Sequence, residues 1–572
     1  MTRWHTHFCL LLAWLPATVS AQTISSFSPA LGNVGTLLTL TGTGLSTVTA
    51  VTVNGAVALL LGKTNTSLRL MVMPGTTTGP VTATGGATAT STTAFIVTNT
   101  ALNTAQQGNP LAGSGTIGAA WQGYSVALAA DGNTLAIGGY MDNTNAGATW
   151  VFARSGTVWT QQGTKLVGTG RVGTSSQGAS VAMSADGNTM AVGAPSDNNN
   201  TGATWVSIRS GTSWSQQGLK LVGTGAVGNA SQGNSVALSA DGNTLAIGGA
   251  GNDNGNGAVW VFTRSGTTWS QQGTYLVGAG ALNEAYQGRA VALSADGNTL
   301  AVGGSNDGNF VGATWVFIRS GSSWSQQGSK LVGTGGVGTI RQGQAVALSA
   351  NGNTLAVGAP IDNGASGATW IFARSGTAWS QQGTKLVGAG AVPNPNNVRQ
   401  GWSVSLSTDG NTLAVGAVND NVSVGATWLF ARSGTVWSQQ GNKLVGTGAV
   451  NNALQGSSVA LSADGTTLAV GGYGDNNATG AAWVFSSANS PLAQAAAVGP
   501  RARAHFYPNP AAEQLTIAGG PGAGALRLFD GLGRAVMTGF YRTDQPLDLS
   551  SLAPGLYWLQ LGHAPACPLL KR

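Results

Sequence analysis

The strongest constraint on this chain is a motif that returns at a nearly constant spacing. The stretch "SADGNTLAIGG" at 239–249 has near-copies throughout the middle of the sequence. The Asp or Asn that opens each copy stands at 131, 186, 241, 296, 351, 409 and 464, so the intervals are 55, 55, 55, 55, 58 and 55 residues. A period of this length indicates a repeat architecture, in which each unit buries its apolar surface against its neighbours.

Each unit contains four runs of alternating apolar and polar residues. In the third copy they are "QGNSVALSADG", "NTLAIGG", "GAVWVFTRSG" and "TTWSQQGTYLVG", and each ends at a glycine turn. Such runs predict short antiparallel strands. Four strands per unit and seven units predict a seven-bladed β-propeller, a fold that leaves only short strand edges exposed.

The two ends of the array predict how the ring closes. The "QQG" copies start at 106, 161, 216, 271, 326, 381 and 439, so the first precedes any complete unit. No copy follows the last "WVF" at 483–485. We therefore expect "QQGNPLAG" near the N-terminal end of the array to supply the fourth strand of the last blade.

Two series of acidic residues recur with the repeat. The Asp of Asp-Gly lies between strands one and two, where the connection has hairpin length, so it predicts a tight turn rather than a calcium loop with six or more oxygen ligands. The second series lies in the longer loop between strands two and three. We expect it to form Asx turns, with weak calcium binding as the minor alternative and no other cofactor. Its members are Asp142, Asp197, Asp307, Asp362, Asp420 and Asp475.

The repeat array lacks the residues of the common catalytic systems. All four histidines and both cysteines lie outside it, which excludes Ser/His/Asp, Cys/His and His-based metal chemistry there. Glu284 is its only glutamate, and its aspartates hold repeat positions. The prediction is a protein that is not an enzyme, with a paired-carboxylate hydrolase as the competing class.

Tryptophan also recurs with the repeat, at two positions in each unit. A large apolar side chain at a fixed place in every blade favours packing within and between blades. The first series is Trp150, Trp205, Trp260, Trp315, Trp370, Trp428 and Trp483, and the second is Trp159, Trp214, Trp269, Trp324, Trp379 and Trp437.

The unit resembles the FG-GAP repeats that form the blades of integrin-type propellers. "GYSVALAADG", "LAVGAP" and "GATWVF" carry the resemblance over nearly the whole array, 99–486, although the Asp-rich calcium loop of that family is missing. Residues 22–98 resemble an IPT/TIG domain of the immunoglobulin-like class. The matching positions include Phe27, Pro29, "VNG" at 53–55 and Phe95.

The two ends of the chain predict export. Residues 1–21 have the features of a signal peptide: Arg3, the apolar "FCLLLAWL" and the small-residue site "VSA". No stretch is long and apolar enough to predict a transmembrane span. After a linker at 487–503, residues 504–572 resemble the C-terminal sorting domain of the type IX secretion system of Gram-negative bacteria, through "YPNP" at 507–510, "GLY" at 555–557 and the terminal Lys571.

Composition agrees with an all-β extracellular protein. Charged residues make up only 8% and glycine counts 89, while the net charge of +7 is spread over single residues without a basic run. This disfavours nucleic-acid binding. The predicted fold is therefore an Ig-like sandwich, a seven-bladed propeller and a small C-terminal β-sandwich, and the predicted location is the secreted fraction or the outer cell surface, with the type IX machinery as a partner.

The candidate binding face follows from where the repeats differ. Loops two-to-three and four-to-one share one face of a propeller, and large side chains flank some of the "QG" pairs there. Aromatic residues and arginine are enriched in binding sites, so this face is the predicted site for an unidentified glycan or protein ligand of a binding or adhesion protein. A purely structural surface-layer role is a further alternative. The candidate residues are Trp121, Tyr124, Tyr286, Arg289, Arg341, Arg399 and Trp402.

Overall fold

The computed structural model describes most of the chain outside its ends. The described residues are 21–98, 105–392, 397–486, 505–507, 512–518, 523–530, 534–542, 545–561 and 567–572. The predicted linker and all but the last residue of the predicted signal peptide lie outside this set, as do parts of the sorting domain. The chain divides into two compact units, Met1–Leu492 and Ala493–Arg572.

Residues 23–97 form a mostly antiparallel β-structure, with one parallel pair between β2 and β8, and its core strands alternate buried and exposed side chains. Leu38 and Leu40 face Leu68 and Leu70 in the core, and Phe95 closes it. Inward apolar and outward polar residues are what a strand with one solvated face requires. Its elements are β1 (Thr23–Ser28), β2 (Leu31–Gly32), β3 (Leu37–Thr43), the 3₁₀ turn η1 (Leu45–Thr47), β4 (Ala50–Val53), β5 (Ala56–Lys63), β6 (Ser67–Met71), β7 (Gly79–Thr84) and β8 (Thr88–Val97).

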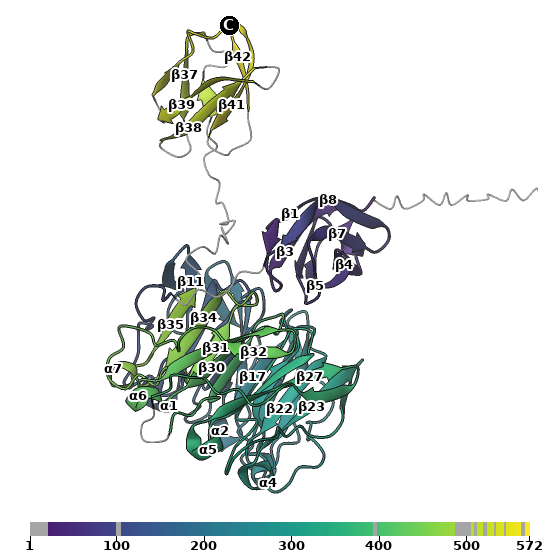
Figure 1. Cartoon of the computed structure of the whole chain (residues 1–572), viewed down its shortest axis with the longest axis vertical. Helices are drawn as coiled ribbons and strands as arrows, with labels where there is room; N and C mark the ends of the chain where they lie inside the picture. Colours follow the sequence, from purple (N-terminus) through teal and green to yellow (C-terminus); the bar gives the residue numbers. More distant parts are fainter. Residues whose placement is uncertain are drawn as a thin grey trace, which may run out of the picture. The chain divides into compact units, whose positions relative to one another are not determined.

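The repeat array forms seven antiparallel sheets (Figure 1), and within each sheet neighbouring strands are consecutive in the sequence. The predicted propeller of four-stranded blades is confirmed. The strands of the first four blades are β9 (Ser125–Leu128), β10 (Thr134–Gly139), β11 (Ala148–Ser155), β12 (Val158–Gln161); β13 (Ser180–Met183), β14 (Thr189–Ala194), β15 (Ala203–Ser210), β16 (Ser213–Gln216); β17 (Ser235–Leu238), β18 (Thr244–Gly249), β19 (Ala258–Ser265), β20 (Thr268–Gln271); and β21 (Gln287–Leu293), β22 (Thr299–Gly304), β23 (Ala313–Ser320), β24 (Ser323–Gln326).

The remaining blades repeat the pattern. Their strands are β25 (Ala345–Leu348), β26 (Thr354–Ala359), β27 (Ala368–Ser375), β28 (Ala378–Gln381); β29 (Ser403–Leu406), β30 (Thr412–Ala417), β31 (Ala426–Ser433), β32 (Val436–Gln439); and β33 (Ser458–Leu461), β34 (Thr467–Gly472), β35 (Ala481–Ser486). The second strand of most blades is buried along its whole length, which explains its uninterrupted apolar sequence, whereas the outer strand alternates exposed and partly buried residues.

The last blade is completed by the N-terminal end of the array. Leu111 and Ala482 of β35 exchange backbone hydrogen bonds of 2.8 and 2.9 Å, and the Gln107 N–H donates to the Val484 carbonyl at 2.7 Å. Gln106 forms a further bridge to Phe485. The ring is therefore shut by its own first strand, as the phase of the "QQG" copies predicts.

A second set of hydrogen bonds joins all seven blades around the axis. The second residue after each innermost strand donates its N–H to the carbonyl of the equivalent residue in the next blade, at 2.9 to 3.0 Å. The last bond, from Ala463 to Ala130, closes the circle. The innermost strands line a channel of about 250 Å³ with side chains such as Val236, Val291 and Val346.

The C-terminal unit is a small β-structure with a core of Leu515, Ile517, Leu526, Leu528 and Leu559. Its strands are β36 (His505–Tyr507), β37 (Gln514–Ala518), β38 (Ala523–Phe529), β39 (Ala535–Arg542), β40 (Pro546–Asp548), β41 (Gly555–Leu561) and β42 (Cys567–Lys571). Among the described residues, no helix is long and apolar enough to cross a membrane.

Candidate functional site

The loop between strands two and three is a single left-handed turn in every blade. In the second blade, Asn198 and Asn199 have φ of 50° and 54°. Asparagine tolerates this conformation better than other non-glycine residues, so backbone geometry accounts for the Asn-rich runs. The turns that Figure 1 labels all lie on one side of the propeller. They are α1 (Asp142–Asn145), α2 (Asp197–Asn200), α3 (Asn252–Gly255), α4 (Asp307–Phe310), α5 (Asp362–Ala365), α6 (Asp420–Ser423) and α7 (Asp475–Ala478).

The buried aspartate that opens most of these turns is neutralised by a lysine. In the first blade, Asp142 Oδ2 lies 2.5 Å from Lys165 Nζ, and Asp142 Oδ1 accepts from the Ile117 N–H at 2.8 Å. The predicted Asx turns are therefore wrong: these carboxylates hold the four-to-one loop and a lysine of the outer segment instead of their own backbone. The pairs are Asp142–Lys165, Asp197–Lys220, Asp307–Lys330, Asp362–Lys385 and Asp420–Lys443.

Two blades depart from this pairing in different ways. In the third, both partners are exchanged: Asn252 replaces the acid, and Tyr275 packs 5.7 Å from Trp260 where other blades hold the lysine. In the last, Asp475 is retained, yet the closing strand offers Pro110 at the lysine position. Asp475 is 6% exposed, and burial raises its pKa despite hydrogen bonds from the Val450 and Asn476 N–H groups.

The Asp-Gly turns are structural, as predicted. Asp186 accepts hydrogen bonds from the Ser184 hydroxyl at 2.6 Å, the Asn188 N–H at 3.0 Å and the Asn188 amide at 2.9 Å. These bonds occupy both carboxylate oxygens. Within the part of the chain that the structure describes, no group of three or more His, Cys, Asp or Glu side chains gathers as a metal site would require.

Both tryptophan series pack at the blades, as predicted. Trp260 is fully buried and donates its indole N–H to the Thr224 carbonyl at 2.9 Å. Trp269 of the second series donates to Gln217 of the preceding blade at 3.0 Å, and the guanidinium of Arg264 lies 5.3 Å from its ring. The repeated arginines and both tryptophan series are thus committed to holding the blades together.

The position before each "QG" has a left-handed backbone in all seven blades. The buried glutamine fixes this geometry: Gln177, for example, accepts from the Gly168 N–H at 2.6 Å and donates back to its carbonyl at 3.0 Å. Glycine and asparagine suit such a position best. The chain uses neither of them there. The seven residues, with φ from 55° to 64°, are Trp121, Ser176, Ser231, Tyr286, Arg341, Arg399 and Leu454.

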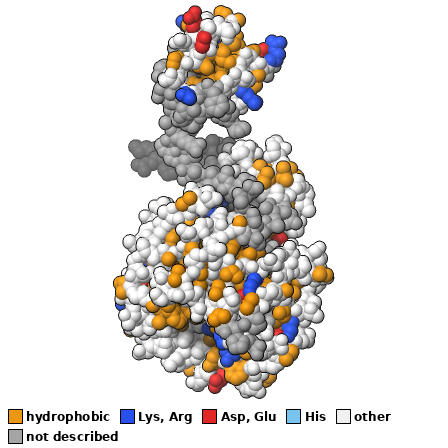
Figure 2. Space-filling model, turned by 60° about the vertical axis from the view of Figure 1, so that its left-hand side comes forward, with side chains coloured by type: hydrophobic (Ala, Val, Ile, Leu, Met, Phe, Trp, Pro, Cys, Tyr) orange, Lys and Arg blue, Asp and Glu red, His pale blue; other side chains and the backbone are white. Residues whose placement is uncertain are grey.

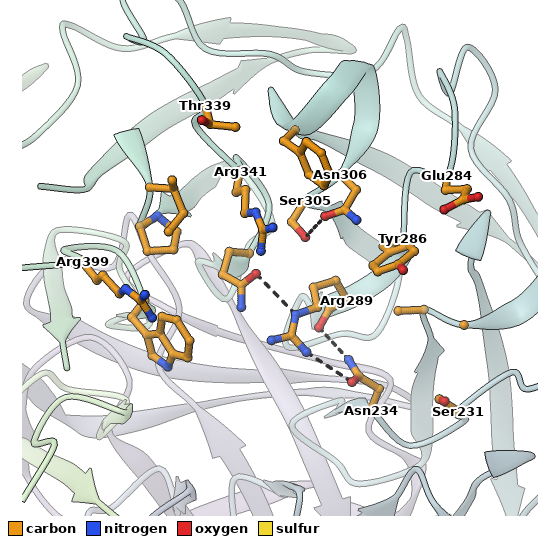
Figure 3. A pocket seen from close by; sticks show the side chains of 17 residues that line it. Ser231, Asn234, Glu284, Tyr286, Arg289, Ser305, Asn306, Thr339, Arg341 and Arg399 are labelled. Atoms are coloured by element: carbon orange, nitrogen blue, oxygen red, sulfur yellow. Dashed lines mark hydrogen bonds between the residues drawn. The ribbon is translucent and has the colours of Figure 1, made fainter. Parts of the chain in front are cut away.

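Five of the seven predicted site residues line one pocket. It has a volume of about 1010 Å³, and its walls include Tyr286, Arg289, Arg341, Arg399 and Trp402 (Figure 3). Asn234, Arg289, Gln344 and Trp402 stand at the start of successive innermost strands. The pocket therefore opens at the channel end opposite the Asp-Gly turns. We call this end of the propeller the channel mouth.

The arginines of the pocket are ordered by neutral partners. Arg289 bridges two blades, donating to Asn234 Oδ1 at 3.3 Å and Gln344 Oε1 at 3.4 Å (Figure 3). The Arg341 guanidinium lies 5.1 Å from the Phe310 ring, and that of Arg399 lies 5.6 Å from Trp402. Cation–π contacts of this kind orient a guanidinium without neutralising its charge.

The other two predicted residues belong to an aromatic cluster at the channel mouth. Trp121 stacks on Tyr473 with ring centroids 4.8 Å apart, and Tyr124 meets Tyr140 edge-on at 4.6 Å. Burial, followed by the neighbouring Tyr124 and Tyr473, raises the pKa of Tyr140 to about 12. Burial and the neighbouring Tyr124 raise the pKa of Tyr473, and the positive charge of Arg399 partly offsets this increase.

Several residues of the channel mouth were missed by the sequence analysis. Tyr140 and Tyr473 follow strand two, where the other blades have Ala, Pro, Ser or Val. The comparison of repeats that selected the "QG" neighbours would have found both tyrosines if applied to that position. Glu284 and Phe310 were also missed as lining residues. Both stand in variable loops of the predicted face, Glu284 two residues before Tyr286 and Phe310 in the turn between strands two and three, so the same comparison would have pointed to them.

Comparisons with known proteins identify the two flanking domains. Residues 23–98 match the family model described as IPT/TIG domain, and residues 505–565 match the one described as secretion system C-terminal sorting domain. The chain carries an IPT/TIG domain and a type IX sorting domain. A sorting domain of this kind indicates secretion or a cell-surface location. The resemblance of the repeats to FG-GAP blades stays a prediction.

Whole-chain comparisons add little to this. No curated protein matches the sequence. Among solved structures, Kuenenia stuttgartiensis hydrazine synthase is similar with a TM-score of 0.42 at 13% identity, over 66% of this chain and 99% of that one. The fold assignment therefore rests on the strand order, the closing strand and the ring of hydrogen bonds.

Proposed function

We propose that the protein is an extracellular binding protein that holds its ligand at the channel mouth of the propeller. The observation that carries the proposal is the set of left-handed residues before the "QG" pairs. Four of the seven are Trp, Tyr or Arg, held in a backbone conformation that costs roughly 1–2 kcal/mol for a side chain of this kind. Strain of this sort is typical of functional sites, where the surrounding structure holds it in place.

The channel mouth also differs from the rest of the surface in composition. On the propeller face shown in Figure 2, uncharged polar side chains and backbone predominate, with apolar side chains in small patches. The pocket instead gathers three arginines and three aromatic rings, those of Tyr286, Phe310 and Trp402. This combination is the one that concentrates binding energy in protein recognition sites.

Binding is favoured over hydrolysis by the number of carboxylates in the pocket. Glu284 is the only acidic residue among the lining side chains, whereas glycosidases of the common type need two carboxyl groups flanking the scissile bond. Replacing Glu284 with Gln tests the hydrolase alternative directly. Product release from polysaccharides or peptides that disappears in Glu284→Gln would overturn the proposal.

The binding site is tested by truncating its side chains in the mature protein. A screen of surface polysaccharides and proteins first identifies a ligand. Arg289→Ala and Trp402→Ala should then each weaken binding about thirtyfold, corresponding to roughly 2 kcal/mol, without lowering the melting temperature. Leu219→Ala, at a side chain that is 85% exposed outside the pocket, is the matched control.

Two results would contradict this placement of the site. If both variants bind a confirmed ligand as well as the wild type does, the ligand lies elsewhere, with the IPT/TIG domain as the next candidate. If the mature protein retains no soluble ligand from the screen, a structural role in the surface layer becomes the better explanation.

A further inference from the structure

The charge of the channel mouth is unbalanced. Arg289, Arg341 and Arg399 line the pocket together with one carboxylate, that of Glu284. Within the described residues, none of the three guanidinium groups lies within salt-bridge distance of an Asp or Glu. Their partners are the neutral Asn234, Gln344 and Asn397 and the rings of Phe310 and Trp402.

The remaining cations of the propeller are mostly committed elsewhere. Five lysines are paired with the buried aspartates of the left-handed turns. The arginine that ends the third strand of a blade, such as Arg264, donates to Asn243 at 3.0 Å and stacks on Trp269. The channel mouth is therefore where arginines without a carboxylate partner are available to bind a negatively charged ligand.

We infer that the ligand held at the channel mouth is an acidic polysaccharide, one whose sugars carry carboxylate or sulfate groups; this inference rests on the proposed binding function. A guanidinium group presents parallel N–H donors that match the two oxygens of such an anion. Three guanidinium groups from consecutive blades, at Arg289, Arg341 and Arg399, suit charges repeated along a chain better than one isolated anion.

The uncharged part of the channel mouth fits sugar rings. The cluster of Trp121, Tyr124, Tyr140 and Tyr473 offers rigid surfaces that are apolar on their faces and polar at their tips. The Tyr140 hydroxyl is protonated at neutral pH, as that of an ordinary tyrosine is, and is able to donate to a sugar oxygen.

A second cavity extends the pocket with amide groups. It has a volume of about 570 Å³ and shares Glu284, Asn306 and Phe310 with the first. Its other polar side chains are Asn256, Asn283 and Asn309. Amides offer both donors and acceptors to hydroxyl groups, so this extension suits the neutral positions of a polysaccharide.

An acidic peptide fits the site less well. Peptides are commonly bound along a free strand edge or in an apolar groove. The pocket walls between the arginines are hydroxyl and amide groups such as Ser231, Ser305 and Thr339. Binding of an acidic peptide can be distinguished experimentally with oligoglutamate as a probe.

The test is titration calorimetry on the full mature chain. The probes are oligouronates of several backbone types, sulfated galactan oligomers, the methyl-esterified oligouronates, which keep the sugar but lose the charge, and oligoglutamate of equal charge. We expect binding to at least one acidic oligosaccharide, weakened at least tenfold by esterification or desulfation and falling as salt is raised. Uronate and sulfate probes distinguish the two sources of negative charge.

Variants assign the binding to individual side chains. Arg289→Gln, Arg341→Gln and Arg399→Gln should each lower affinity about tenfold or more for the acidic oligosaccharide while changing affinity for its neutral counterpart less than threefold. Arg171→Gln removes the same charge from an exposed loop arginine outside the pocket and serves as the control for long-range electrostatics. It should change affinity less than twofold.

The outcomes separate this inference from the proposed function. Equal binding of neutral and acidic oligosaccharides, with loss only in Trp402→Ala, would overturn the acidic ligand but keep the site. Binding of oligoglutamate alone would replace the polysaccharide with a peptide. Acidic-oligosaccharide binding that all three arginine variants retain would move the site away from the channel mouth, and no binding of any acidic probe would refute the inference itself.

Discussion

Single residues in this propeller are under backbone constraints that the repeat imposes on all blades alike. The turn between strands two and three needs positive φ at consecutive positions, and most blades satisfy it with Asn or Gly. Val422 is an exception, with φ of 56° in a turn where the second blade has Asn199. A β-branched residue in this conformation stores strain.

The first prediction concerns this strain. Val422→Asn should stabilise the protein by about 1 kcal/mol, because asparagine adopts the left-handed conformation more readily and the valine side chain is 59% exposed, so little packing is lost. Thermal unfolding measures the gain. Asn199→Val, the reverse exchange at the equivalent position of the second blade, should lower stability by a similar amount. If both variants melt at the wild-type temperature, the turns carry no strain.

The second prediction concerns the buried acid without a lysine. Asp475→Asn should raise the melting temperature at pH 7, since asparagine keeps the acceptor for the Val450 N–H, as Asn252 does toward Val227, and removes a buried charge. Asp362→Asn is the matched control. It leaves Lys385 without its partner and should cost roughly 2 kcal/mol.

The pH dependence of Asp475 gives an independent check. Burial raises the pKa of Asp475 above its ordinary value of 3.8. The folded chain therefore binds this proton more tightly than the unfolded chain, and stability is lost as the pH rises through the folded pKa. The advantage of Asp475→Asn over the wild type should shrink as the pH is lowered toward 3.8 and below. An advantage that stays constant over this range would contradict the assignment.

At the scale of elements, the structure depends on one strand that comes from the opposite end of the array. Blades one to six hold four consecutive strands each, whereas the last holds β33, β34 and β35 and receives residues around Leu111 as its outer strand. Because the outer strand of the last blade comes from the opposite end of the array, only noncovalent bonds between this strand and β35 close the ring.

The third prediction tests this closure. Leu111→Pro removes the N–H that bonds to Ala482 and the side chain that packs beneath it, at a cost of roughly 3 kcal/mol or more. Hydrogen exchange should show the loss of protection first in β35, with β19 on the far side of the ring protected longest. Simultaneous loss in all seven blades would indicate that the ring opens as one cooperative unit.

At the scale of the whole molecule, the chain combines a β-propeller with a secretion sorting domain. The C-terminal unit has its own core and the match to a secretion sorting domain, while the propeller closes on itself without using any residue of that unit. Export and folding should therefore be separable.

The fourth prediction follows from this separation. Deleting residues 504–572 should leave a propeller with unchanged melting temperature that accumulates in the periplasm of the native host. Fractionation and protease accessibility on intact cells measure its location, and the full chain is the control. A truncated protein that still reaches the surface would show that the sorting function lies elsewhere.

The sequence by itself determined the architecture, because that information is local and repeated. Strand alternation has a period of two, Asp-Gly and Ser-Gly specify turns, and the phase of "QQG" relative to "WVF" requires the N-terminal strand to close the ring. The two flanking families are likewise recognised from short contiguous motifs. For these features each residue's role depends on near neighbours along the chain.

Only the tertiary structure decided which side chains meet. Asp142 pairs with Lys165, which follows the outer strand, and accepts from the Ile117 N–H instead of forming an Asx turn. Trp121 stacks on Tyr473, 352 residues later in the sequence, because the ring places the first and last blades side by side. Arg289, Arg341 and Arg399 share one pocket because three consecutive blades present their four-to-one loops at the same end of the channel. Contacts between blades depend on the closed ring, and no local pattern encodes them.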